Sequence, residues 1–152
     1  MAELGQQLGV KVVMTDSSLP SGSDRVWAAV KDLECDAVVN IQGDEPLLKG
    51  ELVDALVQGY YAATTEMATL IKPLEIQDLN NPNVVKAVIN QKNEAFYFSR
   101  LPIPYTRLQP EGKIDGCWQH LGLYVYKKSF LKEFCMTAPC ILERSESLEQ
   151  LR

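Results

Sequence analysis

The segment Gln42-Gly43-Asp44-Glu45-Pro46 is the strongest candidate for chemistry in this sequence. It follows a nearly continuous apolar run at residues 36–41, which is typical of a strand buried on both faces. A glycine there lets the backbone turn sharply and approach a ligand. Asp44 then places a carboxylate where a hard cation such as Mg²⁺ could bridge it to phosphate groups. Taken alone, the segment also fits an ordinary turn with solvent-facing acidic residues.

A second candidate is the loop at residues 19–25, which runs directly into a predicted helix. The backbone N–H groups and hydroxyls of Ser21, Gly22 and Ser23 would suit an anion or the polar edge of a base. Arg25 adds a planar fork of donors. The alternative is an ordinary helix cap beside a solvated arginine, and the segment by itself favours that alternative.

Three further positions carry polar groups that could bind a substrate. Arg100 follows the strand-like run at residues 96–99 and could clamp a carboxylate. His120, the single histidine, begins another strand. Glu149 and Gln150 lie in a charged segment near the end of the sequence. Each position also has a structural interpretation: a surface cation, a hydrogen-bonded histidine and an amphipathic helix.

The spacing of apolar residues predicts the elements that position these groups. Helices are predicted at residues 1–8, 21–33, 50–63, 129–136 and 142–151, strands at 10–14, 36–42, 67–73 and 121–126, a β-hairpin at 84–98, and a loop or arm at 101–113. Ser21 and Asp24 have the spacing of a capping box. Alternating strands and helices predict one α/β domain over residues 1–152, with a mostly parallel sheet and helices on both faces. Ligands of such sheets bind beyond the carboxyl ends of the strands.

Composition excludes several other classes of protein. The 152 residues are 46% hydrophobic and carry a net charge of −5, which disfavours general nucleic-acid binding. Neither a membrane helix nor a signal peptide is predicted, so we expect a cytoplasmic protein. The four cysteines form no C-x-x-C pair, so a zinc site is not expected. We expect the cysteines to be free thiols. A glycine-rich phosphate loop and a histidine-based catalytic triad are also absent from the sequence.

Seven stretches, taken in order, resemble the family of 3-deoxy-manno-octulosonate (KDO) cytidylyltransferases, also called CMP-KDO synthetases. They are Val12-Val13-Met14-Thr15, Ser21-Gly22-Ser23-Asp24-Arg25, Val38-Val39-Asn40-Ile41-Gln42-Gly43-Asp44-Glu45-Pro46, Asn81-Pro82-Asn83-Val84-Val85-Lys86, Phe96-Tyr97-Phe98-Ser99-Arg100, His120-Leu121-Gly122 and Glu146-Ser147-Leu148-Glu149-Gln150-Leu151-Arg152. One such stretch is weak, whereas the ordered set is specific. The resemblance implies a nucleotide-diphospho-sugar-transferase-like (Rossmann-like) fold with a hairpin arm.

The resemblance also implies a reaction and a set of site residues. CTP and KDO would give CMP-KDO and pyrophosphate with Mg²⁺, for lipopolysaccharide biosynthesis, and catalysis would rest on positioning and charge neutralisation. The implied metal ligand is Asp44, and Asp44 and Arg100 would be catalytic. The implied nucleotide contacts are Ser21, Gly22, Ser23, Arg25 and Gln42, and the implied sugar contacts are Arg100, His120, Glu149 and Gln150. A homodimer is implied as well, and the arm at residues 101–113 with the adjacent hairpin could form its interface.

Several family features are missing from these 152 residues. The resemblance implies a central segment of the enzyme, because the basic loop R-x-x-S-x-R-L-P-G-K-P, which holds the triphosphate, and the second metal aspartate do not occur. The family also usually has a basic residue at Gln119 and Ser/Thr-Pro at Cys140-Ile141. We therefore expect the chain on its own to have no measurable synthetase activity. Activation of another acidic sugar and a non-catalytic remnant of the family are the alternative functions.

Overall fold

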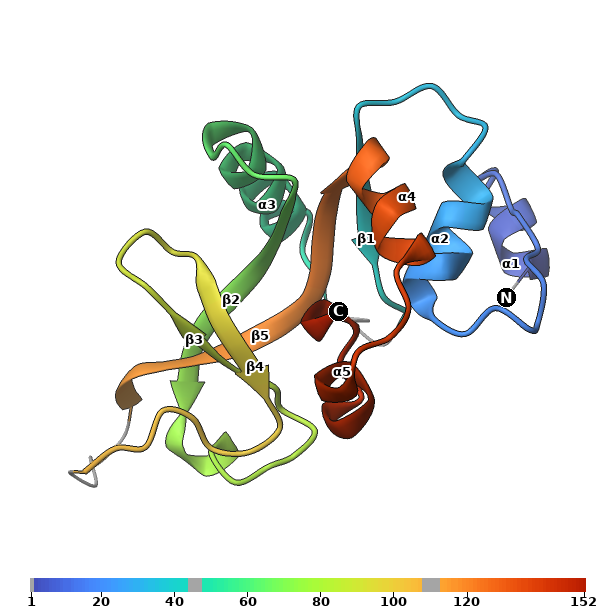
Figure 1. Ribbon diagram of the computed structural model, residues 1–152. Coiled ribbons are helices and arrows are strands. Elements are labelled where there is room, and N and C mark those ends of the chain that lie inside the picture. Colours follow the sequence, from blue (N-terminus) through green and yellow to red (C-terminus); the bar gives the residue numbers. More distant parts are fainter. Residues whose placement is uncertain (1, 44–47, 108–112) are drawn as a thin grey trace.

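The computed structural model describes residues 2–43, 48–107 and 113–152, with one layer of strands between helices (Figure 1). The helices are α1 (Ala2–Gln7), α2 (Gly22–Val30), α3 (Gly50–Ala62), α4 (Lys128–Met136) and α5 (Ile141–Glu146), with the short 3₁₀ turns η1 (Ile76–Asp78) and η2 (Glu149–Leu151). The strands are β1 (Ala37–Ile41), β2 (Met67–Glu75), β3 (Lys86–Ile89), β4 (Ala95–Ser99) and β5 (Lys113–Lys127). No helix in this described part has the length and hydrophobicity needed to cross a bilayer.

The long strand β5 organises the sheet. It pairs with β1 and β3 along one edge and with β2 along the other, and β4 extends the sheet beyond β3. All pairings among the described strands are antiparallel, so the prediction of a mostly parallel sheet is wrong in this respect. The apolar run of β1 correctly indicated a strand covered on both faces, but such a run reports burial and carries no information on the direction of the neighbour.

Helices cover both faces of the sheet, as predicted (Figure 1). On one face Val38 of β1 packs with Tyr124 and Tyr126 of β5 against apolar residues of α2 and α4. On the other face Leu123 and Val125 of β5 pack against α3. Successive strand residues point to opposite faces, so β5 supplies the core of both layers. The α/β layering thus follows directly from the two apolar stripes of one strand.

Several elements form close to where the residue pattern places them. Ser21 caps α2: its Oγ accepts a hydrogen bond from Asp24 N at 3.2 Å and donates one to Asp24 Oδ2 at 2.6 Å. The predicted hairpin is β3–β4, closed around Asn90 and Asn93, and the latter has a φ of 62°. Asparagine is one of the residues that tolerate this left-handed conformation. Residues that are close together in the sequence therefore determine where α2 begins and where the β3–β4 hairpin turns.

Two predicted elements are different in the structure. Residues 10–14 form no strand: Val10, Val13 and Met14 are 58%, 44% and 81% exposed, and no described strand pairs with them. A strand requires a hydrogen-bonding neighbour, which apolar composition does not supply. The helix predicted at 142–151 is interrupted at Ser147, whose φ of 53° ends α5 before η2 begins. This break turns the last residues back toward the sheet.

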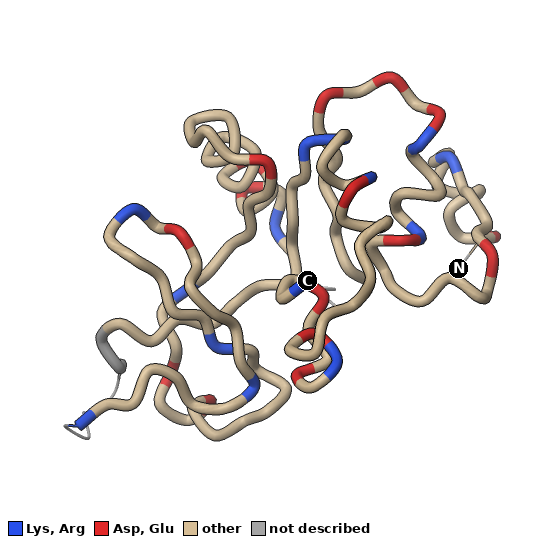
Figure 2. The backbone as a smooth tube through the Cα atoms, viewed as in Figure 1, with Lys and Arg blue, Asp and Glu red and all other residues tan. Residues whose placement is uncertain are grey.

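Charged groups are spread over the whole molecule. Figure 2 shows Lys and Arg interspersed with Asp and Glu along the chain. The strongest buried ion pair among the described residues joins Arg152 Nη2 to Glu143 Oε1 at 2.6 Å. This pair fixes the end of the chain against α4 and α5, because Arg152 also donates to Phe134 O at 3.2 Å. The segment with Glu149 and Gln150 is thereby held in place.

Candidate active site

The N-terminus of α2 meets a carboxylate from the far end of the chain. Gly22 N donates to Glu149 Oε1 at 3.0 Å, and Ser23 N donates to Glu149 Oε2 at 3.4 Å, although the first pair is separated by 127 residues in sequence. The first N–H groups of a helix have no partner within the helix and carry partial positive charge. Glu149 satisfies two of them. Residues expected at the nucleotide and at the sugar therefore lie side by side.

Gln42, one residue beyond β1, lies at the same place. A Cβ atom built on Gly22 would lie 3.8 Å from Glu149 Oε1 and 4.0 Å from Gln42 Nε2. One built on Gly122 of β5 would lie 3.9 Å from Gln42 Cγ. The Gln42 side chain therefore lies close to the backbone of both Gly22 and Gly122. The structure gathers five of the predicted residues here: Ser21, Gly22, Ser23, Gln42 and Glu149.

His120 belongs to a neighbouring buried cluster on β5. Its Nε2 lies 2.9 Å from Thr69 Oγ1, and the Thr69 hydroxyl lies 2.7 Å from Leu123 O. Because the hydroxyl has one hydrogen and a carbonyl can only accept it, we assign Nε2–H as the donor to Thr69. The imidazole also packs against the rings of Phe98 and Tyr124, with centroids 5.1 and 5.3 Å away. Thr69, Phe98 and Tyr124 therefore fix the orientation of the His120 ring.

Gln150 joins this cluster through Tyr124, whose hydroxyl donates to Gln150 Oε1 at 3.2 Å. Gln150 Nε2 is buried and has no hydrogen-bond partner among the described residues, and the same is true of Asn40 Nδ2 on β1. Asn40 pairs with Tyr124 across the sheet, so both amides belong to the surroundings of this tyrosine. Buried donors normally have a hydrogen-bond partner. Each of these two amides therefore has an N–H group that is available for a further hydrogen bond.

Burial lowers the pKa of His120 to about 4, because the imidazolium form is desolvated. The unfolded chain takes up this proton near the ordinary value of 6.5 and the folded chain does not, so the stability that the neutral ring contributes is fully present above 6.5 and is lost as the pH falls toward 4. We expect the free energy of unfolding to fall by about 2 kcal/mol between about pH 7 and about pH 5 from this group.

Urea unfolding of the chain and of its His120→Gln variant at both pH values would measure this contribution as a difference between their pH dependences. The imidazole C–H resonances of this single histidine give an independent titration. Equal pH dependence in the two proteins, or a titration near the ordinary value, would contradict the buried neutral state.

The Arg100 side chain makes more hydrogen bonds within the protein than its predicted role as a substrate ligand requires. Its Nε donates to Glu146 O at 2.7 Å, Nη1 to Pro82 O at 2.9 Å and Nη2 to Ser147 O at 3.3 Å. These bonds tie the end of β4 to the turn that precedes Glu149. Apart from these bonds to described residues, one N–H on each terminal nitrogen is available to a ligand. The structure thus places Arg100 beside the segment of Glu149 and Gln150, as a tie that still has free donors.

The carboxylate of Glu146, which the residue patterns did not single out, also binds residues at the end of β4. It accepts from Ser99 Oγ at 2.6 Å and from Arg100 N at 2.9 Å, with Tyr97 OH at 3.5 Å. Burial raises the pKa of Glu146, but these hydrogen bonds outweigh it and the pKa is lowered overall. Lys86, Thr69 and Tyr124 were also not predicted as site residues. For Lys86 a signal exists in the sequence, because it is a lone charge within an apolar strand.

One predicted site residue, Arg25, does not join this arrangement. The Arg25 guanidinium donates to Thr15 Oγ1 at 3.1 Å and to Asp16 O at 2.9 Å, and it also bonds Ser17 O and Leu19 O. It therefore organises the loop before α2. Asp44 lies outside the described residues, which contain no group of three or more potential metal ligands.

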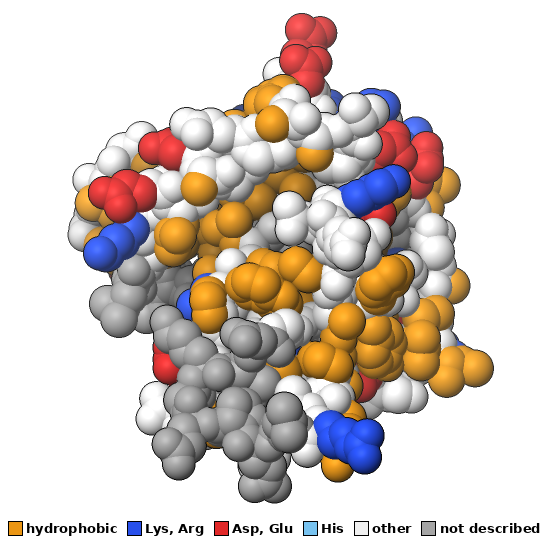
Figure 3. Space-filling model, turned by 90° about the vertical axis from the view of Figure 1, so that its left-hand side faces the viewer, with side chains coloured by type: hydrophobic (Ala, Val, Ile, Leu, Met, Phe, Trp, Pro, Cys, Tyr) orange, Lys and Arg blue, Asp and Glu red, His pale blue; other side chains and the backbone are white. Residues whose placement is uncertain are grey.

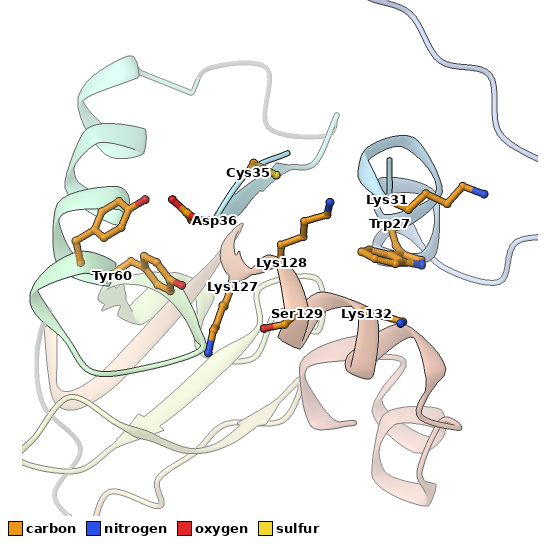
Figure 4. Close-up of a pocket in the computed structure, with 10 residues that line it drawn as sticks. Trp27, Lys31, Cys35, Asp36, Tyr60, Lys127, Lys128, Ser129 and Lys132 are labelled. Atoms are coloured by element: carbon orange, nitrogen blue, oxygen red, sulfur yellow. The ribbon is translucent and has the colours of Figure 1, made fainter. Parts of the chain in front are cut away.

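Hollows in the described structure include two that lie near β5. One, of about 970 Å³, lies between α3, β2 and the β3–β4 hairpin and includes Thr69, Phe98 and Gln150 in its lining. Figure 3 shows hydrophobic side chains gathered on this face. The other, of about 580 Å³, lies where β5 ends and α4 begins. Its four lysines point in different directions (Figure 4), so they do not converge on one ligand, and the hollow lies at the opposite end of β1 from Gln42.

The cytidylyltransferase family model matches residues 1–152. The chain belongs to this family. It is 54% identical over 150 residues to the 3-deoxy-manno-octulosonate cytidylyltransferase of Bdellovibrio bacteriovorus, covering 97% of the chain and 61% of that relative. It is 41% identical over 156 residues to the enzyme of the same description from Chlorobium chlorochromatii, covering all of the chain and 62% of the relative.

A solved structure of CMP:2-keto-3-deoxy-manno-octonic acid synthetase complexed with CTP has the same fold. The TM-score is 0.88 at 34% sequence identity, over 98% of this chain and 61% of that one. The α/β fold implied by the family resemblance is therefore confirmed. The cytidylyltransferase chain described here spans about three fifths of the length of these relatives.

Proposed function

We propose that this chain forms the substrate-binding centre of an enzyme that transfers CMP from CTP to KDO, giving CMP-KDO and pyrophosphate. The observation that supports this proposal most directly is the meeting of Glu149 with Gly22, Ser23 and Gln42 at one end of β1. Two segments that the family resemblance assigns to different substrates are in contact there. Such contact is what group transfer between two bound substrates requires.

In this proposal each group has a defined task. The Gln42 amide, beside the N-terminus of α2, binds the cytidine, since an amide can both donate and accept at the polar edge of a base. The free N–H groups of Arg100 bind the sugar carboxylate, and His120 and Gln150 contact its hydroxyls. The sugar hydroxyl is thereby oriented toward the α-phosphate. Bound Mg²⁺ would neutralise phosphate charge, and Asp44 is the residue that we propose to hold it.

The proposal includes a homodimer. Phe96 of β4 is 71% exposed, and Leu101 and Tyr105, which follow it in the chain, are 70% and 90% exposed. Large exposed apolar residues that cluster are typical of protein interfaces.

The proposed reaction uses CTP in the cytoplasm and supplies an activated acidic sugar for lipopolysaccharide biosynthesis.

The test combines binding and turnover. Calorimetry on the chain should detect binding of CTP and of KDO. For turnover, the chain replaces the matching segment of the Bdellovibrio relative, and pyrophosphate release is measured with CTP, Mg²⁺ and a panel of sugars. KDO should be the preferred acceptor. Faster release with an amino-substituted KDO or a nonulosonate would reassign the sugar, and a folded chimera without release would favour the non-catalytic alternative.

A further inference from the structure

Lys86 is a fully buried cation with no ion pair among the described residues. It lies in β3 and its side chain is 0% exposed. Its Nζ donates to two carbonyl oxygens, Asn81 O at 2.7 Å and Arg100 O at 2.9 Å. A buried ammonium that lacks a carboxylate partner is strongly disfavoured relative to an apolar residue of similar size. Such a position indicates a task that an uncharged side chain would not perform.

Charges of both signs lie around Lys86. Burial lowers the pKa of Lys86, the charge of Asp78 raises it, and the charge of Arg100 lowers it further. The nearby carboxylate of Glu146 is already occupied by Ser99 and by the Arg100 backbone. Two cations thus lie close together at the end of β4, and one of them is shielded from solvent. Charges in such a place act over longer distances than exposed charges do.

We propose that Lys86 determines the preference of this site for an anionic sugar. Its Nζ holds the Arg100 backbone at the end of β4, and its buried charge adds to that of the Arg100 guanidinium, which is the proposed partner of the sugar carboxylate. Asp78 and Glu146 offset part of this positive charge, and an anion bound to Arg100 would be attracted by the remainder. The inference rests on the proposed function, because it takes the end of β4 as the place of the sugar carboxylate.

The alternative is that Lys86 only ties two loops together through its hydrogen bonds. The two roles differ in their dependence on the charge of the ligand. A structural tie affects every ligand of the site to the same extent. An electrostatic role affects KDO and leaves its uncharged methyl ester nearly unchanged, because the ester retains the hydroxyl groups but has no carboxylate.

The experiment measures the affinity of the chain for KDO, for KDO methyl ester and for CTP by calorimetry. Lys86→Met should weaken KDO binding by about tenfold and ester binding by less than about twofold. Lys86→Gln, which keeps a donor but no charge, should behave in the same way and carries the test if Lys86→Met does not fold. Lys132→Met, at an exposed position of α4, is the matched control and should change neither affinity.

The inference is overturned if both ligands lose affinity equally, or if Lys86→Gln binds KDO as well as the unsubstituted chain does. Those results leave the proposed function intact, because the unsubstituted chain still binds both substrates. If the unsubstituted, folded chain binds neither CTP nor KDO, the proposed function fails and this inference fails with it.

Discussion

Replacing Glu143 by alanine should lower the free energy of unfolding by about 3–5 kcal/mol, because it leaves a buried guanidinium without its carboxylate. The side chains of Arg152 and Glu143 are only 3% and 9% exposed. Arg152 Nε donates to Glu143 Oε2 at 2.9 Å and Nη2 to Oε1 at 2.6 Å, a bidentate pair. The Arg152 guanidinium also lies 4.7 Å from the Phe134 ring centroid, so water cannot easily replace the lost partner.

Urea unfolding followed by circular dichroism measures this loss directly. Glu133→Ala, at an exposed position of α4, is the matched control and should change stability by less than about 0.5 kcal/mol. The double variant Glu143→Gln with Arg152→Met should be more stable than Glu143→Ala, because it removes both charges. A cost below about 1 kcal/mol for Glu143→Ala would show that the pair is effectively solvated.

The second large effect concerns turnover. In the chimera with the Bdellovibrio relative, Asp44→Asn should reduce CMP-KDO formation at least about a hundredfold, because a neutral amide is a poorer ligand for Mg²⁺ than a carboxylate. The expectation rests on the family motif, since Asp44 lies outside the described residues. Far-ultraviolet circular dichroism should be unchanged.

The measurement is pyrophosphate release at several Mg²⁺ concentrations. Asp54→Asn, an exposed position of α3, makes the same chemical change away from the site and should leave the rate unaltered. Partial recovery of the Asp44→Asn variant at high Mg²⁺ would agree with a weakened metal site. A nearly normal rate at low Mg²⁺ would refute the assignment of Asp44.

Only part of the site could be derived from residue types. Ser21 was predicted as a helix cap and is one, because capping depends on residues three positions apart. Glu149 was predicted near the sugar, but its contact with Gly22 could not be derived from spacing, since the two are 127 residues apart. Glu146 was not predicted for a related reason: its hydrogen bonds to Ser99 and Arg100, more than 40 residues away, leave no periodic pattern in the sequence.

The sequence by itself determined the local features of this protein: the apolar stripes of α2, α3 and β1, the turn of the β3–β4 hairpin, and the ordered motifs of a cytidylyltransferase. These features depend on residues near one another in the chain, and the propensities and periodicity of such residues can be read from the sequence. The tertiary structure decided the antiparallel pairing of β5 with β1 and β2, the absence of a strand at residues 10–14, and the break at Ser147. It also decided which polar groups meet, because partner, direction and burial depend on non-local packing, and periodicity reports only that a face is covered.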